Sequence, residues 1–76
     1  MDEAERQASA ARVRQVANAI EEDIVLGWLQ PQERLIEEDI ASRFGIKRYV
    51  VREAIAELVR MGLVERMQNK GAAVRM

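Results

Sequence analysis

Cysteine and histidine are both absent from this chain of 76 residues. Their absence excludes disulfides, thiolate nucleophiles, imidazole and thiolate metal ligands, and the commonest acid–base catalyst. Threonine is missing too, so Ser9 and Ser42 are the only aliphatic hydroxyls. The composition therefore argues against an enzyme, and it indicates neither a cofactor nor a metal site.

Long hydrophobic runs are also missing, since the longest uninterrupted aliphatic run is Ile24-Val25-Leu26. A membrane-spanning helix needs about 20 apolar residues, and a signal peptide begins with basic residues where this chain begins with acidic ones. We therefore expect a cytoplasmic protein that does not enter a membrane. A chain this short can form one small domain, which we expect to span residues 1–76, with a folded core from about residue 11 and flexible residues 1–10.

The net charge of −1 conceals a strong polarity along the sequence. Residues 1–41 carry four arginines against ten carboxylates, a net charge of −6. Residues 42–76 carry eight basic residues against three glutamates, a net charge of +5. This distribution favours a protein with one face that meets a polyanion and another that does not.

The first half of the chain contains two predicted helices. Apolar residues at spacings of three and four predict an amphipathic helix from about residue 8 to 26, ended by Gly27. After an extended connection, a short strand over 34–36 is followed by a second helix over about 37–44, whose acidic first turn suits the helix dipole. The side chains expected to face inward here are Ile36, Ile40 and Phe44.

The second half is predicted to form a third helix and a hairpin. The helix runs from about residue 48 to 61 and stops at Gly62. Two strand-like runs, 63–68 and 72–75, surround a turn that contains Asn and Gly. The inward side chains of the helix are expected to be Val51, Ile55, Leu58 and Val59. The predicted fold is mainly α with a small β component, a winged helix-turn-helix of three helices and a β-hairpin wing.

The start of the third helix has the wrong residues for stability alone. Lys47 and Arg48 occupy positions where a Ser, Thr, Asp or Asn cap and acidic residues are favoured, at a cost of about 1–2 kcal/mol. Arg48 and Arg52 lie one turn apart, and neither has an acidic residue three or four positions away within the helix, so both are interpreted as unpaired. In a helix-turn-helix this end enters the major groove, where arginine can donate two hydrogen bonds to guanine. We expect Arg48 and Arg52 to read bases and Lys47 to contact a phosphate.

The other candidates leave alternatives open. Tyr49 is expected to point outward, where it could contact a base edge or a phosphate or could cover apolar surface. Arg43 lies at the end of the second helix, where its charge is favourable to the helix dipole. This accounts for an arginine at that position about as well as a phosphate contact does. Arg60 is expected to pair with Glu57 on the helix surface. The wing residues expected to reach the minor groove or the backbone, rather than form only a polar hairpin tip, are Asn69, Lys70 and Gly71.

These residues resemble the GntR family of bacterial transcription regulators. The family's pattern is a Ser-Arg-Thr-Pro-Val-Arg-Glu-Ala-Leu run, followed by a leucine, a Gly-Leu-Val and a glycine in the wing. The similarity covers about residues 13–76 and is greatest to the branch whose all-helical C-terminal domain binds small carboxylates, like the fatty-acid-responsive regulators. The matching positions in this part of the chain are Arg48, Val51, Arg52, Glu53, Ala54, Leu58, Gly62, Leu63, Val64 and Gly71.

The resemblance implies a transcription factor that binds a palindromic operator in double-stranded DNA, with the recognition helix (about 48–61) in the major groove and the wing (about 64–75) near the minor groove or backbone. Lys47, Tyr49 and Val50 replace the family's Ser, Thr and Pro, so the contacts of the small hydroxyls do not transfer and the operator sequence stays open. Gln32 replaces a common glycine. Glu38 stands where some relatives use a basic residue against phosphate, so that contact is not carried over.

Members of the family have a ligand-binding and dimerising domain after the wing, whereas this sequence ends at Met76. An excised DNA-binding domain and a natural short protein are both compatible with it. A longer parent is expected to be a homodimer. The chain alone is expected to be a monomer or weak dimer without an effector site, and to bind DNA weakly because one half-site supplies half the contacts.

The alternative function is a winged helix that binds a protein partner and not DNA. Such a module would present an acidic or apolar recognition surface, and the basic 42–76 half argues against it. A salt titration distinguishes the two, because affinity for a duplex falls steeply with salt when phosphates are neutralised.

Overall fold

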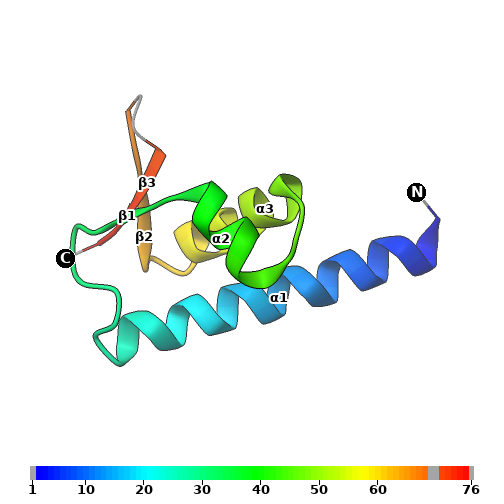
Figure 1. Cartoon of the computed structure of the whole chain (residues 1–76), viewed down its shortest axis with the longest axis horizontal. Helices are drawn as coiled ribbons and strands as arrows, with labels where there is room; N and C mark the ends of the chain where they lie inside the picture. The colour runs from blue at the N-terminus through cyan, green and yellow to red at the C-terminus, as the bar shows by residue number, and fades with distance from the viewer. Residues whose placement is uncertain (1, 69–70, 76) are drawn as a thin grey trace.

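The structure is a computed structural model that describes residues 2–68 and 71–75. In Figure 1, the long first helix runs along one side of the molecule, the two shorter helices pack against it, and the sheet lies toward the end where the chain finishes. The described elements are, in order, α1 (Glu3–Val25), β1 (Arg34–Leu35), α2 (Glu37–Phe44), α3 (Arg48–Arg60), β2 (Val64–Met67) and β3 (Gly71–Val74). The predicted fold class, three helices followed by a β-hairpin wing, is confirmed. None of the helices in the described residues has the length and apolar character needed to cross a bilayer.

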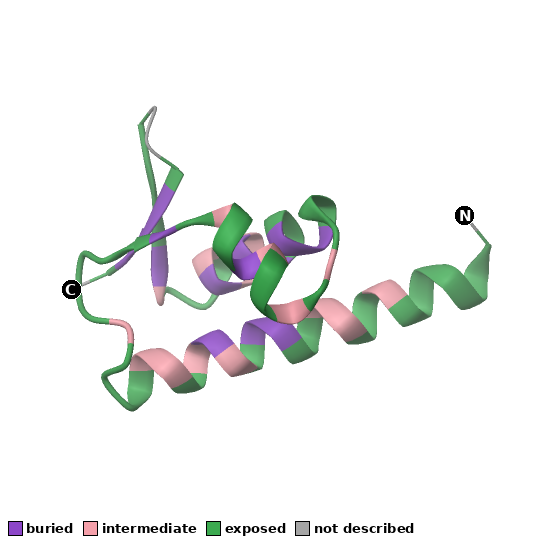
Figure 2. Cartoon of the chain, in the orientation of Figure 1, coloured by how far each residue is buried: buried purple, intermediate pink, exposed green. Residues whose placement is uncertain are grey.

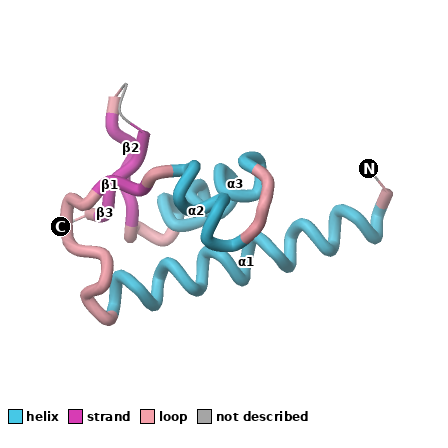
Figure 3. The backbone as a smooth tube through the Cα atoms, in the orientation of Figure 1, coloured by secondary structure: helices cyan, strands magenta, loops and turns pink. Residues whose placement is uncertain are grey.

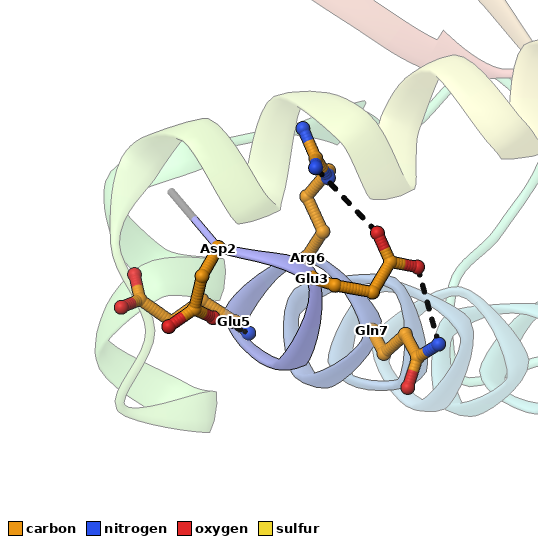
Figure 4. A network of polar contacts seen from close by, with 5 residues as sticks. All are labelled: Asp2, Glu3, Glu5, Arg6 and Gln7. Carbon is orange, nitrogen blue, oxygen red and sulfur yellow. Dashed lines mark hydrogen bonds and ion pairs between the residues drawn. The ribbon is translucent and has the colours of Figure 1, made fainter.

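Helix α1 begins five residues earlier than the hydrophobic spacing predicts. The Asp2 side chain accepts a hydrogen bond from the Glu5 amide (2.8 Å), an N-cap that suits the acidic first turn. Figure 4 shows Glu3 accepting from Arg6 (3.5 Å) and from Gln7 (3.2 Å) along the same face. These first turns are exposed (Figure 2), so polar contacts stabilise them and the spacing of apolar residues cannot reveal where the helix begins. The expected flexibility of residues 1–10 stays a prediction.

The core lies between the three helices and the sheet, each of which contributes buried residues to one cluster. Figure 2 marks buried segments of these elements in purple. Val50 is buried together with its neighbour Val51, whereas Val59, expected to face inward, is half-buried. Phe44 is also half-buried against the core. The fully enclosed members of the core include Val16, Ile20, Val51, Leu58, Val64 and Val74.

Ile36 departs from the prediction that it faces inward. It is 44% exposed and occupies the N-cap position of α2, with extended backbone (φ −97°, ψ 114°). The spacing of four to Ile40 holds only within a helix, and Ile36 lies just outside one. Ile40 itself is buried. The helix therefore begins without the side-chain cap that a Ser or Asp would give.

The three described strands form one antiparallel sheet in the order β1-β3-β2. Strand β3 pairs with β2 through Val64↔Val74 and with β1 through Arg34↔Ala73. Figure 3 shows the β2–β3 hairpin projecting beyond the helices, as expected for a wing. The predicted hairpin is confirmed. Asn69 and Lys70, assigned to its tip, lie outside the described residues.

The connection before β1 contains a strained residue. Of the described residues other than glycine, Gln32 alone has a positive φ, 69°. Its amide donates to the Val74 carbonyl (2.7 Å), and the Val74 amide donates to the Glu33 carbonyl (2.9 Å). The left-handed conformation explains why glycine is suited to this position.

Candidate nucleic-acid interface

Helices α2 and α3 are joined by a tight turn that sets the direction of α3. Gly45 is the C-cap of α2 in the left-handed conformation (φ 63°, ψ 42°) that glycine adopts readily. Lys47 is the N-cap of α3 with extended backbone (φ −80°, ψ 158°). Within the described part of the chain, its side chain makes no capping hydrogen bond, and the first turn of α3 has no acidic residue. The uncapped amides and the exposed Lys47 together present positive charge to the solvent.

Arg48 and Arg52 are both exposed on α3, but the prediction that they are unpaired is wrong. Nη2 of Arg48 lies 3.9 Å from Oε2 of Glu38, and Nε of Arg52 lies 3.5 Å from Oε1 of Glu37. The partners come from the start of α2 and not from α3 itself, so neighbours at helical spacing do not reveal them. Solvent screening keeps exposed pairs of this kind weak, about 0–1 kcal/mol.

Tyr49 and the turn are both held by α1. The Tyr49 hydroxyl lies 3.1 Å from Oγ of Ser9. The Arg12 guanidinium donates to the Phe44 carbonyl (2.5 Å), one of the last carbonyls of α2. The sequence does not reveal the roles of Ser9 and Arg12, because their partners are 40 and 32 residues away. Helix α1 thus braces the turn on which α3 depends.

Arg43 also points toward α1. Its Nη1 lies 2.5 Å from Oδ2 of Asp23, and its guanidinium lies 4.7 Å from the centre of the Phe44 ring. This ion pair gives Arg43 a structural role besides the helix dipole and the phosphate contact considered from the sequence. Arg60 pairs with Glu57 (3.1 Å), as predicted.

The wing contributes one described candidate residue, Gly71, which opens β3 with a positive φ of 78°. A Cβ at this position would meet nothing within 4 Å, so backbone conformation and not crowding favours glycine. Across residues 2–68 and 71–75 there is no group of three or more carboxylates placed to hold a metal ion.

The helices and the hairpin define the class of the protein, a winged helix-turn-helix. Its architecture is similar to the crystal structure of AraR(DBD) in complex with operator ORR3, with a TM-score of 0.76 and 31% sequence identity, over 83% of this chain and 77% of that chain. The family model described as "Bacterial regulatory proteins, gntR family" matches residues 12–74. The chain therefore belongs to the gntR family, as a DNA-binding domain of its transcription regulators.

Two curated relatives are transcriptional repressors. The mannosyl-D-glycerate transport/metabolism system repressor MngR of Escherichia coli (strain K12) is 36% identical over 63 residues, 82% of this chain and 26% of that protein. The HTH-type transcriptional repressor NagR of Bacillus subtilis (strain 168) is 38% identical over 61 residues, 79% of this chain and 25% of that protein. The chain thus spans about a quarter of the length of these relatives. The branch of the family stays a prediction.

Proposed function

We propose that this domain binds a palindromic operator in double-stranded DNA, with α3 in the major groove and the wing against the minor groove or backbone. In this proposal Arg48 and Arg52 donate hydrogen bonds to guanine, and Lys47 contacts a phosphate. The observation that carries it is the start of α3, where an uncapped helix end and three exposed cations lie together. The AraR domain, which has a similar architecture, is seen with an operator.

The same proposal includes contacts from the wing, from Tyr49 and from Arg43. Asn69, Lys70 and Gly71 would contact the minor groove or the backbone from the wing. Tyr49 and Arg43 would contact DNA in addition to, or in place of, their partners on α1. A longer parent protein would act as a homodimeric regulator in the bacterial cytoplasm, without enzymatic activity, and this chain alone would bind half of the operator.

A salt titration on a duplex tests the proposal. We expect the logarithm of the affinity to fall linearly with the logarithm of the salt concentration, with a slope set by the number of phosphates neutralised. Lys47→Ala should reduce that slope by about 1. Arg60→Ala is the matched control, because Arg60 pairs with Glu57, and it should leave the slope unchanged. A flat slope for the unmodified chain, or no binding at low salt, would favour the alternative function, binding of a protein partner.

A further inference from the structure

The first two residues of α2 meet the two proposed reading arginines in different ways. Glu37 approaches Nε of Arg52, the nitrogen within the side chain (3.5 Å). Glu38 approaches Nη2 of Arg48, one of the two terminal nitrogens (3.9 Å). The two glutamates are adjacent in the sequence and carry the same charge, so this difference is purely one of geometry.

The nitrogen that faces the carboxylate decides which donors of each arginine the ion pair involves. A guanidinium can donate two parallel hydrogen bonds to O6 and N7 of guanine through its terminal nitrogens. Arg52, paired through Nε, keeps both terminal nitrogens for such a contact. At 3.9 Å Glu38 makes no hydrogen bond with Arg48, but its charge attracts a terminal nitrogen that the guanine contact uses.

The two carboxylates also differ in exposure, and Glu37 is the more enclosed. The Glu37 side chain is 37% exposed, whereas the Glu38 side chain is 82% exposed. The more enclosed Glu37 has less freedom to leave Arg52. Glu38 extends into solvent and has more freedom to leave Arg48.

We propose that the two glutamates have opposite effects on DNA binding. Glu37 is a positioning residue that holds the Arg52 guanidinium with its terminal nitrogens outward, and so supports discrimination between sequences. Glu38 competes with DNA for Arg48 and lowers the affinity for every duplex. This inference rests on the proposed base-reading role of Arg48 and Arg52.

The competition follows from mass action. The apparent affinity of a site falls by the fraction of the free protein in which the site is available. An exposed pair worth about 0.2–1 kcal/mol has a paired-to-free ratio of about 1.4 to 5, so it lowers the affinity by about two- to sixfold. Removing Glu38 should therefore raise the affinity for DNA by that factor. Removing Glu37 should lower the affinity for the preferred sequence, because Arg52 is no longer held in place.

The experiment compares Glu37→Gln and Glu38→Gln on two duplexes of equal length, one selected from a random library and one of mixed sequence. We expect Glu38→Gln to raise the affinity for both duplexes by about two- to sixfold at low salt. We expect Glu37→Gln to lower the affinity for the selected duplex by about two- to fivefold and to change the mixed one little. Glu22→Gln, which removes the same charge from an exposed position on α1, is the matched control and should change neither by more than about 1.5-fold.

Double variants show whether each glutamate acts through its arginine. In an Arg52→Ala background Glu37→Gln should have no further effect, and in an Arg48→Ala background the gain from Glu38→Gln should shrink to the size of the control. Equal shifts in the same direction for both glutamate variants would overturn the inference in favour of a general charge effect. If Arg48→Ala and Arg52→Ala lose discrimination while the glutamate variants behave as wild type, the inference fails and the base-reading proposal stands. If the arginine variants keep full discrimination, both fail.

Discussion

The hydroxyl of Tyr49 lies 3.1 Å from the hydroxyl of Ser9, although the two residues are 40 positions apart in the chain. The contact joins the first turn of α3 to the N-terminal part of α1, beyond the buried stripe of that helix. Tyr49 replaces a threonine of the family pattern, so the larger side chain reaches a partner within the protein. The hydrogen bond is accessible to solvent, which keeps it weak.

Tyr49 is expected from the sequence either to contact DNA or to cover apolar surface within the protein, and variants of this contact distinguish the two. We expect Tyr49→Phe and Ser9→Ala each to lower the free energy of unfolding by about 0.5 kcal/mol, with the double variant no worse than either single one. Both should leave duplex affinity within about twofold. Urea unfolding and fluorescence anisotropy measure the two quantities. A loss of affinity for Tyr49→Phe that Ser9→Ala does not share would assign the hydroxyl to DNA.

Lys47→Ser should separate stability from binding. Serine at the N-cap of α3 can accept a hydrogen bond from the first turn, so we expect the free energy of unfolding to rise by about 0.5–1 kcal/mol. The lost cation should weaken binding to all duplexes to a similar extent. Ile36→Ser, which introduces the same cap at α2, should raise stability without this loss. If Lys47→Ser binds as tightly as the wild type, Lys47 does not contact phosphate.

Arg52→Ala should relax the sequence preference. We expect a loss of about 1–3 kcal/mol on the selected duplex and much less on one of mixed sequence, because a bidentate base contact disappears. Lys70→Ala, in contrast, should weaken all duplexes similarly. Competition binding with both duplexes gives the two affinities for each variant. Equal losses for Arg52→Ala would show that this side chain contacts only the backbone.

Arg12→Ala should destabilise the helix-turn-helix. The guanidinium donates a partly buried hydrogen bond to the Phe44 carbonyl, and hydrogen bonds to charged groups contribute about 1.5–3 kcal/mol. We expect the free energy of unfolding to fall by an amount in that range. Arg14→Ala, at an exposed position two residues on, is the control and should change it by less than about 0.5 kcal/mol. Similar effects at both positions would mean that the Phe44 contact contributes nothing of its own.

Gln32→Gly should stabilise the protein. A residue with a side chain pays about 1–2 kcal/mol for the left-handed conformation that Gln32 adopts. Glycine removes that cost and loses about 0.4–1 kcal/mol through the entropy of the unfolded chain. We expect a net gain of about 0.5–1 kcal/mol, measured by urea unfolding. Gln32→Val should destabilise, because a branched side chain tolerates positive φ least. The reverse order would mean that the connection is not left-handed in solution.

The sequence predicts the fold well where its signals are local. The bounds of α2 and α3 and the Arg60–Glu57 pair all depend on residues within one or two turns of each other. The polar first turns of α1 carry no apolar period and were therefore missed. Ile36 follows the right spacing but lies one residue outside its helix.

The candidate site is predictable only in part, for a similar reason. The exposed positions of Lys47, Arg48 and Arg52 follow from helical geometry alone. The partners that orient these side chains do not, because Glu37 and Glu38 act across the angle between two helices. That angle is set by core packing, which depends on residues throughout the chain.

The central position of β3 ties the end of the wing to the rest of the domain. Val74 is bonded through its carbonyl to the amide of Gln32 and through its amide to the carbonyl of Glu33, while the Arg75 amide donates to the Leu63 carbonyl. The last described residues are therefore tied by main-chain bonds to two separate segments, one before α2 and one after α3. The outer strand pair of the wing cannot shift at this end without breaking bonds on both sides of the helix-turn-helix.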